Sequence, residues 1–414
     1  KKILCYNILS KNTCIYNNKC VFAHSYEEQI KDKYKELIIE FIKTNKDLSK
    51  INIFEDKNLY NELLIFTREC YKCLIKACNG GYNCRYGVCF KNLKICVLQP
   101  DYSTSGVDYQ NYDPKRDLSA ILPEAKIDHV FLNKLTTYQQ LKQLKENNYD
   151  IYINLCEGYL EWKVPSIDVI MSMDLLELPY TGPTVNLYDP SKTIMKYLAF
   201  CEDVKTPAHI LIESESDLTL LPGNLNFPLF VKPAKAGDSL GVDNASKANN
   251  VADLTIKVKN ILNEFGSALV EEYIDGREFT VLVCGNPDGK TCTSFTPVEY
   301  IFPAGFAFKT YALKTSELHP NANIPVKDPS LAKKLQSIGE QVFMSFNGVG
   351  YARMDFRMDA KGDIYFLEIN FTCSVFYADG YEGSADYILK YDGIGQAGFL
   401  QHIIEEGIAR HQRK

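Results

Sequence analysis

Four residues near the carboxyl end of the chain have the types and spacing needed to bind a metal–phosphate complex. Arg353 and Asp355 are two residues apart, and so are Glu368 and Asn370. Side chains two apart on a β-strand point to the same face. One face would therefore carry a cation, two carboxylates and an amide oxygen. Oxygen ligands of this kind suit Mg²⁺, which keeps several waters and bridges to substrate phosphates.

The segments that carry these residues are typical of a β-hairpin. Apolar and polar residues alternate through "YARMDFRM" (351–358) and "DIYFLEIN" (363–370), with "DAKG" between them. A hairpin that is symmetric about this turn places Asp355 opposite Glu368. The two carboxylates then repel each other unless a cation lies between them. The alternative is an ordinary strand pair whose polar face is solvated.

Two upstream segments carry a lysine near the end of a predicted element. A lysine early in a helix is usually just solvated, whereas a loop with small residues can hold phosphates. "DPSKTIMKYLAF" predicts a helix with Asp189 as N-cap, Pro190 in the first helical position and Lys192 early in the helix. "PLFVKPAKAGDSLGV" (228–242) predicts an apolar strand that runs into Lys232. The loop after it has small residues that free backbone N–H groups to hold phosphate oxygens, namely Gly237, Ser239 and Gly241.

Charge and cysteine are unevenly distributed along the 414-residue chain. The net charge is -6, yet residues 1–96 carry 17 Lys and Arg against 10 Asp and Glu, and nine of the 14 cysteines. A basic first part on an acidic remainder predicts an anionic partner for the first part. No apolar run approaches a membrane span and no secretory signal opens the chain. We therefore expect a cytoplasmic protein with no membrane partner, whose clustered cysteines bind metal.

A zinc-binding pattern opens the chain. Three thiols and an imidazole follow the spacing C-x8-C-x5-C-x3-H: Cys5, Cys14, Cys20 and His24. These groups can close a tetrahedral Zn²⁺ site, which so short a segment needs in order to fold. The segment resembles the CCCH zinc finger of the tristetraprolin type. That resemblance implies binding of single-stranded RNA, with Tyr16 and Phe22 as stacking platforms; the alternative is a zinc-stapled module for protein interaction.

A second cysteine cluster, "CYKCLIKACNGGYNCRYGVC", lies at residues 70–89. Five cysteines compete there for four ligand places, and the set that we prefer for Zn²⁺ is Cys70, Cys73, Cys84 and Cys89, with Cys78 left over. The alternative, buried structural thiols, is disfavoured because the segment has few apolar residues to bury them.

From residue 93 the chain changes to an α/β pattern. Short apolar strands at 94–98, 129–132 and 149–155 alternate with helical segments, which predicts a small domain with parallel strands. Farther on, "ALVEEYIDGREFTVLVC" (268–284) predicts two strands about a turn at Gly276, with Glu271 before the turn and Glu278 after it.

Five motifs in order resemble the ATP-grasp superfamily, and within it the D-alanine–D-alanine ligases: "PYTGP", "DPSK…MK", "PLFVKPAKAGDSLGV", "VEEYIDGREFTV" and "YARMDFRMDAKGDIYFLEIN". The match covers about residues 94–405. It implies an α/β (α+β) ATP-grasp fold with an N-terminal Rossmann-like subdomain, preceded by small zinc-stapled modules. The expected divisions are a zinc finger (1–26), a helical spacer (27–68), a Cys-rich module (69–92), an N-terminal α/β subdomain (93–186), and central (187–268) and C-terminal (269–414) ATP-grasp subdomains.

The resemblance also assigns roles to individual residues. Lys192 and Lys232 would contact the phosphates of ATP, covered by the loop from Gly237 through Ser239 to Gly241. Glu271 and Ile274 would lie at the adenine and Glu278 at the ribose, while Lys309 or Lys314 could supply the charge of the family's mobile loop. Two Mg²⁺ ions would be held by Asp355, Glu368 and Asn370. The candidate catalytic residues are Arg353, which would stabilise the charged acyl-transfer intermediate, with Ser239 and Lys232.

The implied chemistry joins a small-molecule carboxylate to an amine at the expense of ATP, through an acylphosphate. The chain departs from the family where the amino acid is recognised: "QPDYSTSGVDYQNYDP" replaces the first glycine-rich loop, and "FTCSVFYADGYEGSADYIL" follows Asn370. We therefore expect amino-acid or peptide-like substrates other than D-alanine. Related ligases are often dimers, so a homodimer is expected as well.

Two alternatives to this ligase remain open. One is a zinc-finger RNA-binding protein whose ATP-grasp domain is a non-catalytic scaffold. The other is an ATP-grasp phosphotransferase, which transfers phosphate without ligation.

Overall fold

The chain divides into two compact units, Lys1–Asn92 and Leu93–Lys414. The computed structural model describes residues 5, 14, 16, 20–25, 28–30, 93–104, 113–122, 125–158, 163–221, 225–236, 239–310 and 322–414. The predicted Cys-rich module at 69–92 lies outside these residues, as does most of the predicted spacer at 27–68. Among the described residues, no helix is both long and apolar enough to span a membrane.

The second unit begins with a parallel sheet of order β2-β1-β3. Its strands are β1 (Lys94–Pro100), β2 (Lys126–Leu132) and β3 (Ile151–Asn154), and α5 (Thr137–Lys145) and α6 (Ile167–Leu175) follow β2 and β3. Cys96 and Leu98 pack toward α5 and α6, whereas Ile95 and Val97 pack toward α12 (Gly395–Arg413). Burial on both faces explains the continuous apolar run of β1. The predicted α/β pattern with parallel strands is confirmed.

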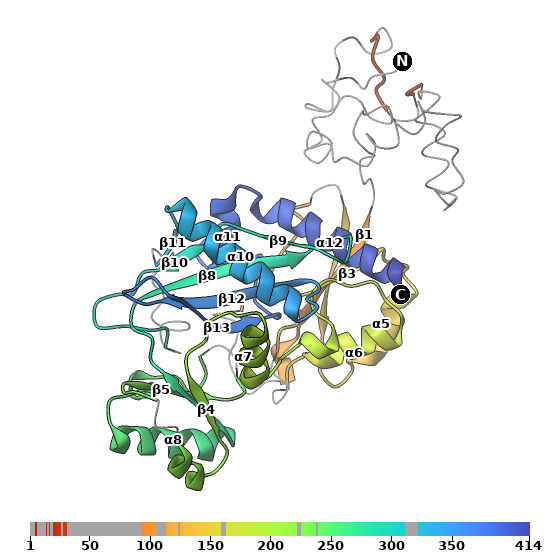
Figure 1. Ribbon diagram of the computed structural model, residues 1–414. Helices are drawn as coiled ribbons and strands as arrows, with labels where there is room; N and C mark the ends of the chain where they lie inside the picture. The colour runs from red at the N-terminus through yellow and green to blue at the C-terminus, as the bar shows by residue number, and fades with distance from the viewer. Residues whose placement is uncertain are drawn as a thin grey trace, which may run out of the picture. The chain divides into compact units, whose positions relative to one another are not determined.

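A small antiparallel sheet follows, of order β4-β7-β5-β6. Its strands are β4 (His209–Ile212), β5 (Leu229–Pro233), β6 (Lys247–Ala248) and β7 (Ala268–Glu272), and α8 (Val251–Phe265) covers one face (Figure 1). The apolar residues of α8 that face the sheet recur at helical spacing, as Leu254, Val258 and Ile261. The helix starts at Asn250, whose side chain accepts a hydrogen bond from the Asp253 amide, and ends at Gly266 in the left-handed conformation.

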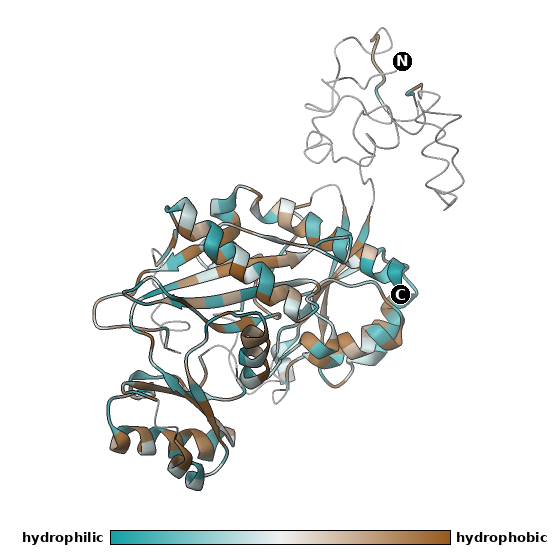
Figure 2. Ribbon diagram, in the orientation of Figure 1, coloured by the Kyte–Doolittle hydropathy of each residue, from teal (hydrophilic) through white to brown (hydrophobic). Residues whose placement is uncertain are grey.

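The largest sheet is antiparallel, with order β11-β10-β8-β12-β13 and β9 beside β8. Its strands are β8 (Arg277–Gly285), β9 (Cys292–Ser294), β10 (Val298–Tyr300), β11 (Asn323–Pro325), β12 (Tyr351–Met358) and β13 (Ile364–Asn370). Helices α7 (Lys192–Cys201) and α10 (Pro329–Ser345) lie on one side of it, and α11 (Ser384–Asp392) and α12 on the other (Figure 1). The helices carry both hydrophilic and hydrophobic residues, as helices that cover a sheet should (Figure 2).

The two faces of β8 differ in a way that positions the site. Phe279, Val281 and Val283 share a core with α7 and α10. On the other face, Leu282 and Cys284 pack against α11 and α12, but Glu278 and Thr280 are polar. That second face is therefore apolar at one end of the strand and polar at the other. Within the described residues, the helices that pack on this face cover only its apolar end.

One local prediction needs correction, and another is confirmed with an addition. The cap of α7 is Ser191, not Asp189: the Ser191 hydroxyl accepts from the Ile194 amide at 3.4 Å, its backbone is extended, and the helix begins at Lys192. The two strands about Gly276 exist, but they belong to different sheets, β7 to the small one and β8 to the large one. Gly276 has φ +145°, and a Cβ there would lie 2.0 Å from the Met358 carbonyl oxygen, so the chain can cross between sheets only with glycine at this point.

Candidate active site

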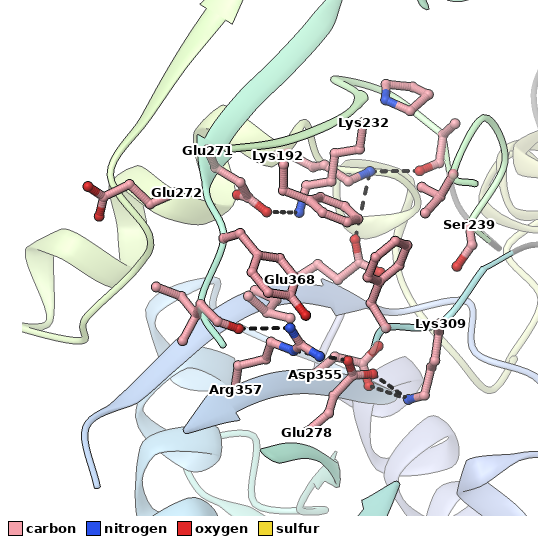
Figure 3. Close-up of a pocket in the computed structure, with 18 of the residues that line it drawn as sticks. Lys192, Lys232, Ser239, Glu271, Glu272, Glu278, Lys309, Asp355, Arg357 and Glu368 are labelled. Atoms are coloured by element: carbon pink, nitrogen blue, oxygen red, sulfur yellow. Dashed lines mark hydrogen bonds and ion pairs between the residues drawn. The ribbon is translucent and has the colours of Figure 1, made fainter. Parts of the chain in front are cut away.

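A pocket of about 780 Å³, counting the space at its mouth, opens between the small sheet and the polar end of the large one (Figure 3). Its walls come from β5, β7 and the loop after β5 on one side, and from β8, β12 and β13 on the other. The predicted site residues that line it are Lys192, Lys232, Ser239, Glu271, Ile274, Glu278, Lys309, Asp355 and Glu368.

The hairpin supplies the floor of the pocket. Asp355 pairs with Glu368 in the β12–β13 register, as predicted from the symmetric turn, and Arg353 pairs with Asn370. Asp355 accepts a hydrogen bond from the Thr280 hydroxyl at 2.7 Å, and its second oxygen lies 3.4 Å from the Arg353 guanidinium. The carboxylates of Asp355 and Glu368 thus face one pocket, and the Arg353 guanidinium lies beside Asp355.

Asn370 and Arg353 lie beside the pocket rather than on its lining. The Asn370 amide oxygen accepts hydrogen bonds from the backbone N–H and the hydroxyl of Thr372, at 2.8 and 3.0 Å. Both lone pairs of this oxygen are thus engaged, so it would become a metal ligand only when the Thr372 hydroxyl turns its hydrogen away.

A buried carboxylate and two lysines form the opposite wall. The Glu271 oxygens lie 2.8 Å from Lys196 Nζ and 2.6 Å from Lys232 Nζ, and all three side chains are almost fully enclosed. Burial alone would raise the pKa of Glu271, but the two ammonium groups outweigh it and lower that pKa to about 2. Sequence reasoning did not single out Lys196, although its position one helical turn after Lys192 was the available signal.

Lys192 connects this wall to the floor. Its ammonium donates to the Ala236 carbonyl oxygen at 2.7 Å and lies 3.8 Å from a Glu368 oxygen. Burial lowers the pKa of Lys192, and the Glu368 carboxylate opposes that effect. Because Lys192 is held at the pocket wall by these contacts, its ammonium group can contact an anion that enters the pocket.

A second ionic cluster lies farther along β8 and β12. Glu278 contacts Lys309 at 3.0 Å and Arg357 at 3.3 Å, and Lys309 also lies 4.0 Å from Asp355. Arg357 donates to the carbonyl oxygens of Ile274, at 2.7 Å, and Ala307. Arg357 was not predicted from the sequence; its two-residue spacing from Asp355 on the same strand face would have indicated it.

Aromatic rings line the end of the pocket near these groups. The ring centroids of Phe230, Tyr273 and Phe308 are 5.0 to 6.2 Å apart. The Tyr273 hydroxyl donates to the Ala307 carbonyl oxygen at 3.1 Å. The rings and the second ionic cluster therefore share this end of the pocket, with the Arg357 guanidinium carbon 5.0 Å from the ring centroid of Tyr273.

The glycine-rich loop is described only in part. Ser239 lines the pocket with φ +56°, while Gly237 and Lys314 lie outside the described residues. Gly241 does not line the pocket. It has φ +71°, and a Cβ there would lie 2.8 Å from Phe265 and 2.9 Å from Pro233, so glycine lets the loop pack closely on α8.

In the first unit, the four predicted zinc ligands come together. The ligand atoms of Cys5, Cys14, Cys20 and His24 all lie within 4.8 Å of one another, with Cys5 and Cys14 Sγ 3.7 Å apart. Tetrahedral zinc with Zn–S bonds near 2.3 Å places its sulfur ligands about 3.8 Å apart. His24 Nε2 is buried and has no hydrogen-bond partner in the described part of the chain. The donor set therefore fits a structural metal ion.

Comparisons with known proteins agree with this geometry. Residues 206–376 match the family model described as D-ala D-ala ligase C-terminus. A D-alanine–D-alanine ligase of Lactococcus lactis subsp. cremoris is 30% identical over 207 residues, which are 48% of this chain and 57% of that protein. One from Bordetella petrii is 26% identical over 204 residues, 48% of this chain and 60% of its own. The chain thus spans a little over half the length of these curated relatives.

Solved structures extend the likeness over more of the chain. The D-alanine–D-alanine ligase of Bacillus anthracis, complexed with ATP, has a TM-score of 0.54 at 18% identity and covers 78% of this chain and 99% of its own. The Coxiella burnetii enzyme has a TM-score of 0.56 at 18% identity, over 78% and 96%. The D-Ala:D-Ser ligase VanG of Enterococcus faecalis gives 0.54 at 17%, over 77% and 100%. The predicted α/β ATP-grasp fold is confirmed.

Proposed function

We propose that residues 93–414 form an ATP-dependent ligase that joins a carboxylate to an amine through an acylphosphate. One observation carries this proposal: Lys192 and Lys232 project into a pocket whose floor holds Asp355 and Glu368 (Figure 3). Cations on one wall suit phosphate oxygens, and carboxylates on the other suit the Mg²⁺ that accompanies them.

The aromatic end of the pocket supports a purine base as occupant. Phe230, Tyr273 and Phe308 offer ring faces and edges there, and Glu278 nearby can accept hydrogen bonds from a sugar. In this arrangement the base lies among aromatic rings and the phosphates extend toward Lys192 and Lys232. This orientation places the last phosphate near the hairpin.

The oxygens of Asp355 and Glu368 would hold Mg²⁺, with Asn370 as a further ligand, and the ion would neutralise charge on the transferring phosphoryl group. A substrate carboxylate oxygen attacks the terminal phosphorus, and ADP leaves with the electrons of the broken P–O bond. An amine then attacks the acyl carbon, and phosphate leaves. Arg353, 3.4 Å from Asp355, would stabilise the negative charge that develops in this second step.

The substrates are proposed to be amino-acid or peptide-like, but not D-alanine. The residues from Phe371 onward differ from the carboxylate-binding motif of D-alanine ligases, although the hairpin before them matches. The nucleotide half of the site is thus preserved in a chain whose acceptor half has changed.

The test is ADP release from the full-length protein with Mg²⁺–ATP and a panel of D- and L-amino acids, dipeptides and simple amines. We expect release that needs both a carboxylate and an amine, with the amide product visible by mass spectrometry. ADP with a stable phosphorylated product and no amide would favour the phosphotransferase. No release with any pair would favour the scaffold.

For the first unit we propose a zinc finger that binds single-stranded RNA. Its support is the convergence of Cys5, Cys14, Cys20 and His24, together with two exposed aromatic side chains beside them. Tyr16 is 61% exposed and Phe22 44% exposed, although aromatic residues are usually covered in folded proteins. Exposed rings on a basic segment can stack on unpaired bases.

A further inference from the structure

A second cluster of ionisable groups lies at the carboxyl edge of the parallel sheet, separate from the residues that line the nucleotide pocket. Arg116 is its centre and is fully buried. Its guanidinium lies 3.2 Å from Glu157 and 3.4 Å from Asp113, and it donates to the carbonyl oxygens of Leu155, at 3.0 Å, and Val375, at 3.3 Å. In open α/β sheets, ligands bind at this edge, where the strands end.

The loop after the hairpin closes over the same cluster. The Ser374 hydroxyl donates to Glu157 at 2.5 Å, and the Tyr377 hydroxyl donates to Asp113 at 2.6 Å. Ser374 is only four residues beyond Asn370, the end of the proposed metal-binding hairpin. Between Ser374 and Tyr377 on the chain, Phe376 has φ +71°, a strained conformation for a non-glycine residue, which its amide maintains by donating to Asp386 at 2.8 Å.

The charges of this cluster do not balance. Arg116 is one cation between two carboxylates, and its two terminal nitrogens are committed to protein oxygens. Asp113 is already the acceptor for Tyr377 and Tyr102. Glu157 accepts from Arg116 and from Ser374, and Ser374 ties it to the end of the hairpin. The two carboxylate side chains are about equally exposed, Asp113 by 15% and Glu157 by 14%. A cation that reaches Glu157 would balance the remaining negative charge of the cluster.

Resting on the proposed ligase function, we propose that Glu157 binds the incoming amine as its ammonium ion and accepts one of its protons. Arg116 and Ser374 act as positioning residues. The step is balanced as follows: the ammonium gives a proton to the Glu157 carboxylate, the nitrogen lone pair forms the C–N bond, and phosphate leaves with the electrons of the C–O bond. The second nitrogen proton leaves with phosphate. The acceptor class is thus a primary amine that is charged in solution.

The proton affinity of Glu157 agrees with this role. Burial raises its pKa, Arg116 opposes the rise, and Asp113 adds to it, so that the pKa lies at about 7. The other titratable groups around it are Cys156 next to it in the chain, Tyr351 on β12, Cys373 and Tyr377 after β13, and Tyr188 before α7, all of whose pKa values are raised. These five are neutral at pH 7, which leaves Glu157 as the group among them that can exchange a proton there.

The experiment compares two nucleophiles on the full-length protein with Glu157→Gln. Hydroxylamine is neutral at pH 7 and needs no base before it attacks, whereas glycinamide arrives charged. With the amino-acid panel as carboxylates, we expect hydroxamate formation to be nearly unchanged by the substitution. Amide formation with glycinamide should fall about 100-fold at pH 7 and recover as the pH rises toward the pKa of the amine.

Two further samples keep the result interpretable. Glu146→Gln, an exposed carboxylate after α5, should behave as wild type with both nucleophiles. Infrared titration should show a protonated carboxyl band that disappears near pH 7 in wild type and is missing from Glu157→Gln. Equal loss with both nucleophiles, no loss with glycinamide, or no such band would overturn this inference. Wild-type protein that makes neither hydroxamate nor amide would instead overturn the ligase, and this inference with it.

Discussion

Glu271 is one carboxylate shared by two buried lysines, Lys196 and Lys232, and the three groups together carry one net positive charge on this wall of the pocket. Lys192 nearby has the Glu368 carboxylate as its partner at 3.8 Å. Buried cations without enough counter-ions are costly, so the wall is at its most stable when an anion is bound. A polyphosphate would provide that charge.

Glu271→Gln should therefore destabilise the protein by about 3 kcal/mol or more, because it leaves Lys196 and Lys232 buried beside a neutral amide. Urea unfolding monitored by circular dichroism measures the loss. Mg²⁺–ATP should restore part of it. Glu272→Gln is the matched control, because this neighbour faces Asn226 at the edge of the same strand. Equal losses in the two variants would contradict the role given to Glu271.

The pH dependence of this difference has a definite sign. The folded-state pKa of Glu271, about 2, lies below its ordinary value of 4.5. Its contribution is thus complete above about pH 4.5 and is lost as the pH falls toward 2. The stability gap between wild type and Glu271→Gln should narrow over that interval in urea titrations. A gap that widened on acidification would show that the carboxylate is not the stabilised form.

Asp355→Asn should lower Mg²⁺-dependent ATP turnover at least about 100-fold, because an amide is a weaker ligand and cannot neutralise the metal's charge. The measurement is ADP release over a range of Mg²⁺ concentrations. Asp363→Asn, on the same hairpin but paired with Lys205 at its outer end, should retain turnover. Full activity in Asp355→Asn would exclude this residue as a metal ligand.

At the scale of elements, one glycine joins two sheets. Gly276 lies between β7 and β8, and its missing side chain leaves room for the Met358 carbonyl oxygen at the end of β12. The contact ties the small sheet to the hairpin that forms the pocket floor. The two walls of the pocket are thus held by backbone as well as by ion pairs.

Gly276→Ala should destabilise the protein by about 3 kcal/mol, the sum of a disfavoured φ and a steric clash with backbone. Gly266→Ala is the control, since Gly266 also has positive φ but a Cβ there would meet no atom within 4 Å. It should cost only about 1 kcal/mol. Urea midpoints of the two variants give the comparison, and equal midpoints would remove the clash from the explanation.

The sequence predicted the helices and strands better than it predicted which strands pair with each other. Strict alternation and a short turn were enough to place Asp355 opposite Glu368, because hairpin register follows from local pattern. That β7 and β8 would join different sheets was not predictable, since a glycine turn looks the same in a hairpin and in a crossing. The cap at Ser191 was missed because Asp-Pro-Ser offers two good caps, and tertiary packing chose between them.

The site was predictable where chemistry and spacing coincided. Lys192 and Lys232, which line the pocket, were assigned to it through the motifs that resemble ATP-grasp ligases. Glu157 lies in "NLCEG" (154–158), whose place at the end of a strand is typical of ligand sites in α/β sheets. Its pairing with Arg116 gave no signal, because the two residues are 41 apart and meet only when β1 and β3 pair. Long-range pairing of this kind leaves no local pattern in a single sequence.

At the scale of the whole molecule, a substitution that removes the activity of one unit should leave the activity of the other unit unchanged. His24→Ala removes one of four proposed zinc ligands, so we expect zinc content to fall and binding of single-stranded RNA to weaken at least about tenfold. ATP turnover by residues 93–414 should be unchanged. Metal analysis and filter binding of an unstructured RNA measure the first two effects.

Tyr16→Ala separates the ring from the metal. Tyr16 is exposed and is not among the proposed ligands, so this variant should keep its zinc and lose only RNA affinity. RNA affinity that survives both substitutions would leave the first unit as a zinc-stapled module with another partner.

Strand β12 sets the spacing of side chains along the proposed reaction site. Tyr351, beside the Glu157 cluster, and Arg353, Asp355 and Arg357 occupy alternate positions along one face of it. In the proposed ligase, steps of about 6.7 Å would set the spacing of the amine, acyl, metal and base positions over about 20 Å. Substrates would have to fit this spacing, because the strand is paired on both sides and cannot stretch. Changes of substrate specificity during evolution would therefore arise in the loops at the two ends of β12, while the spacing of its side chains stays fixed.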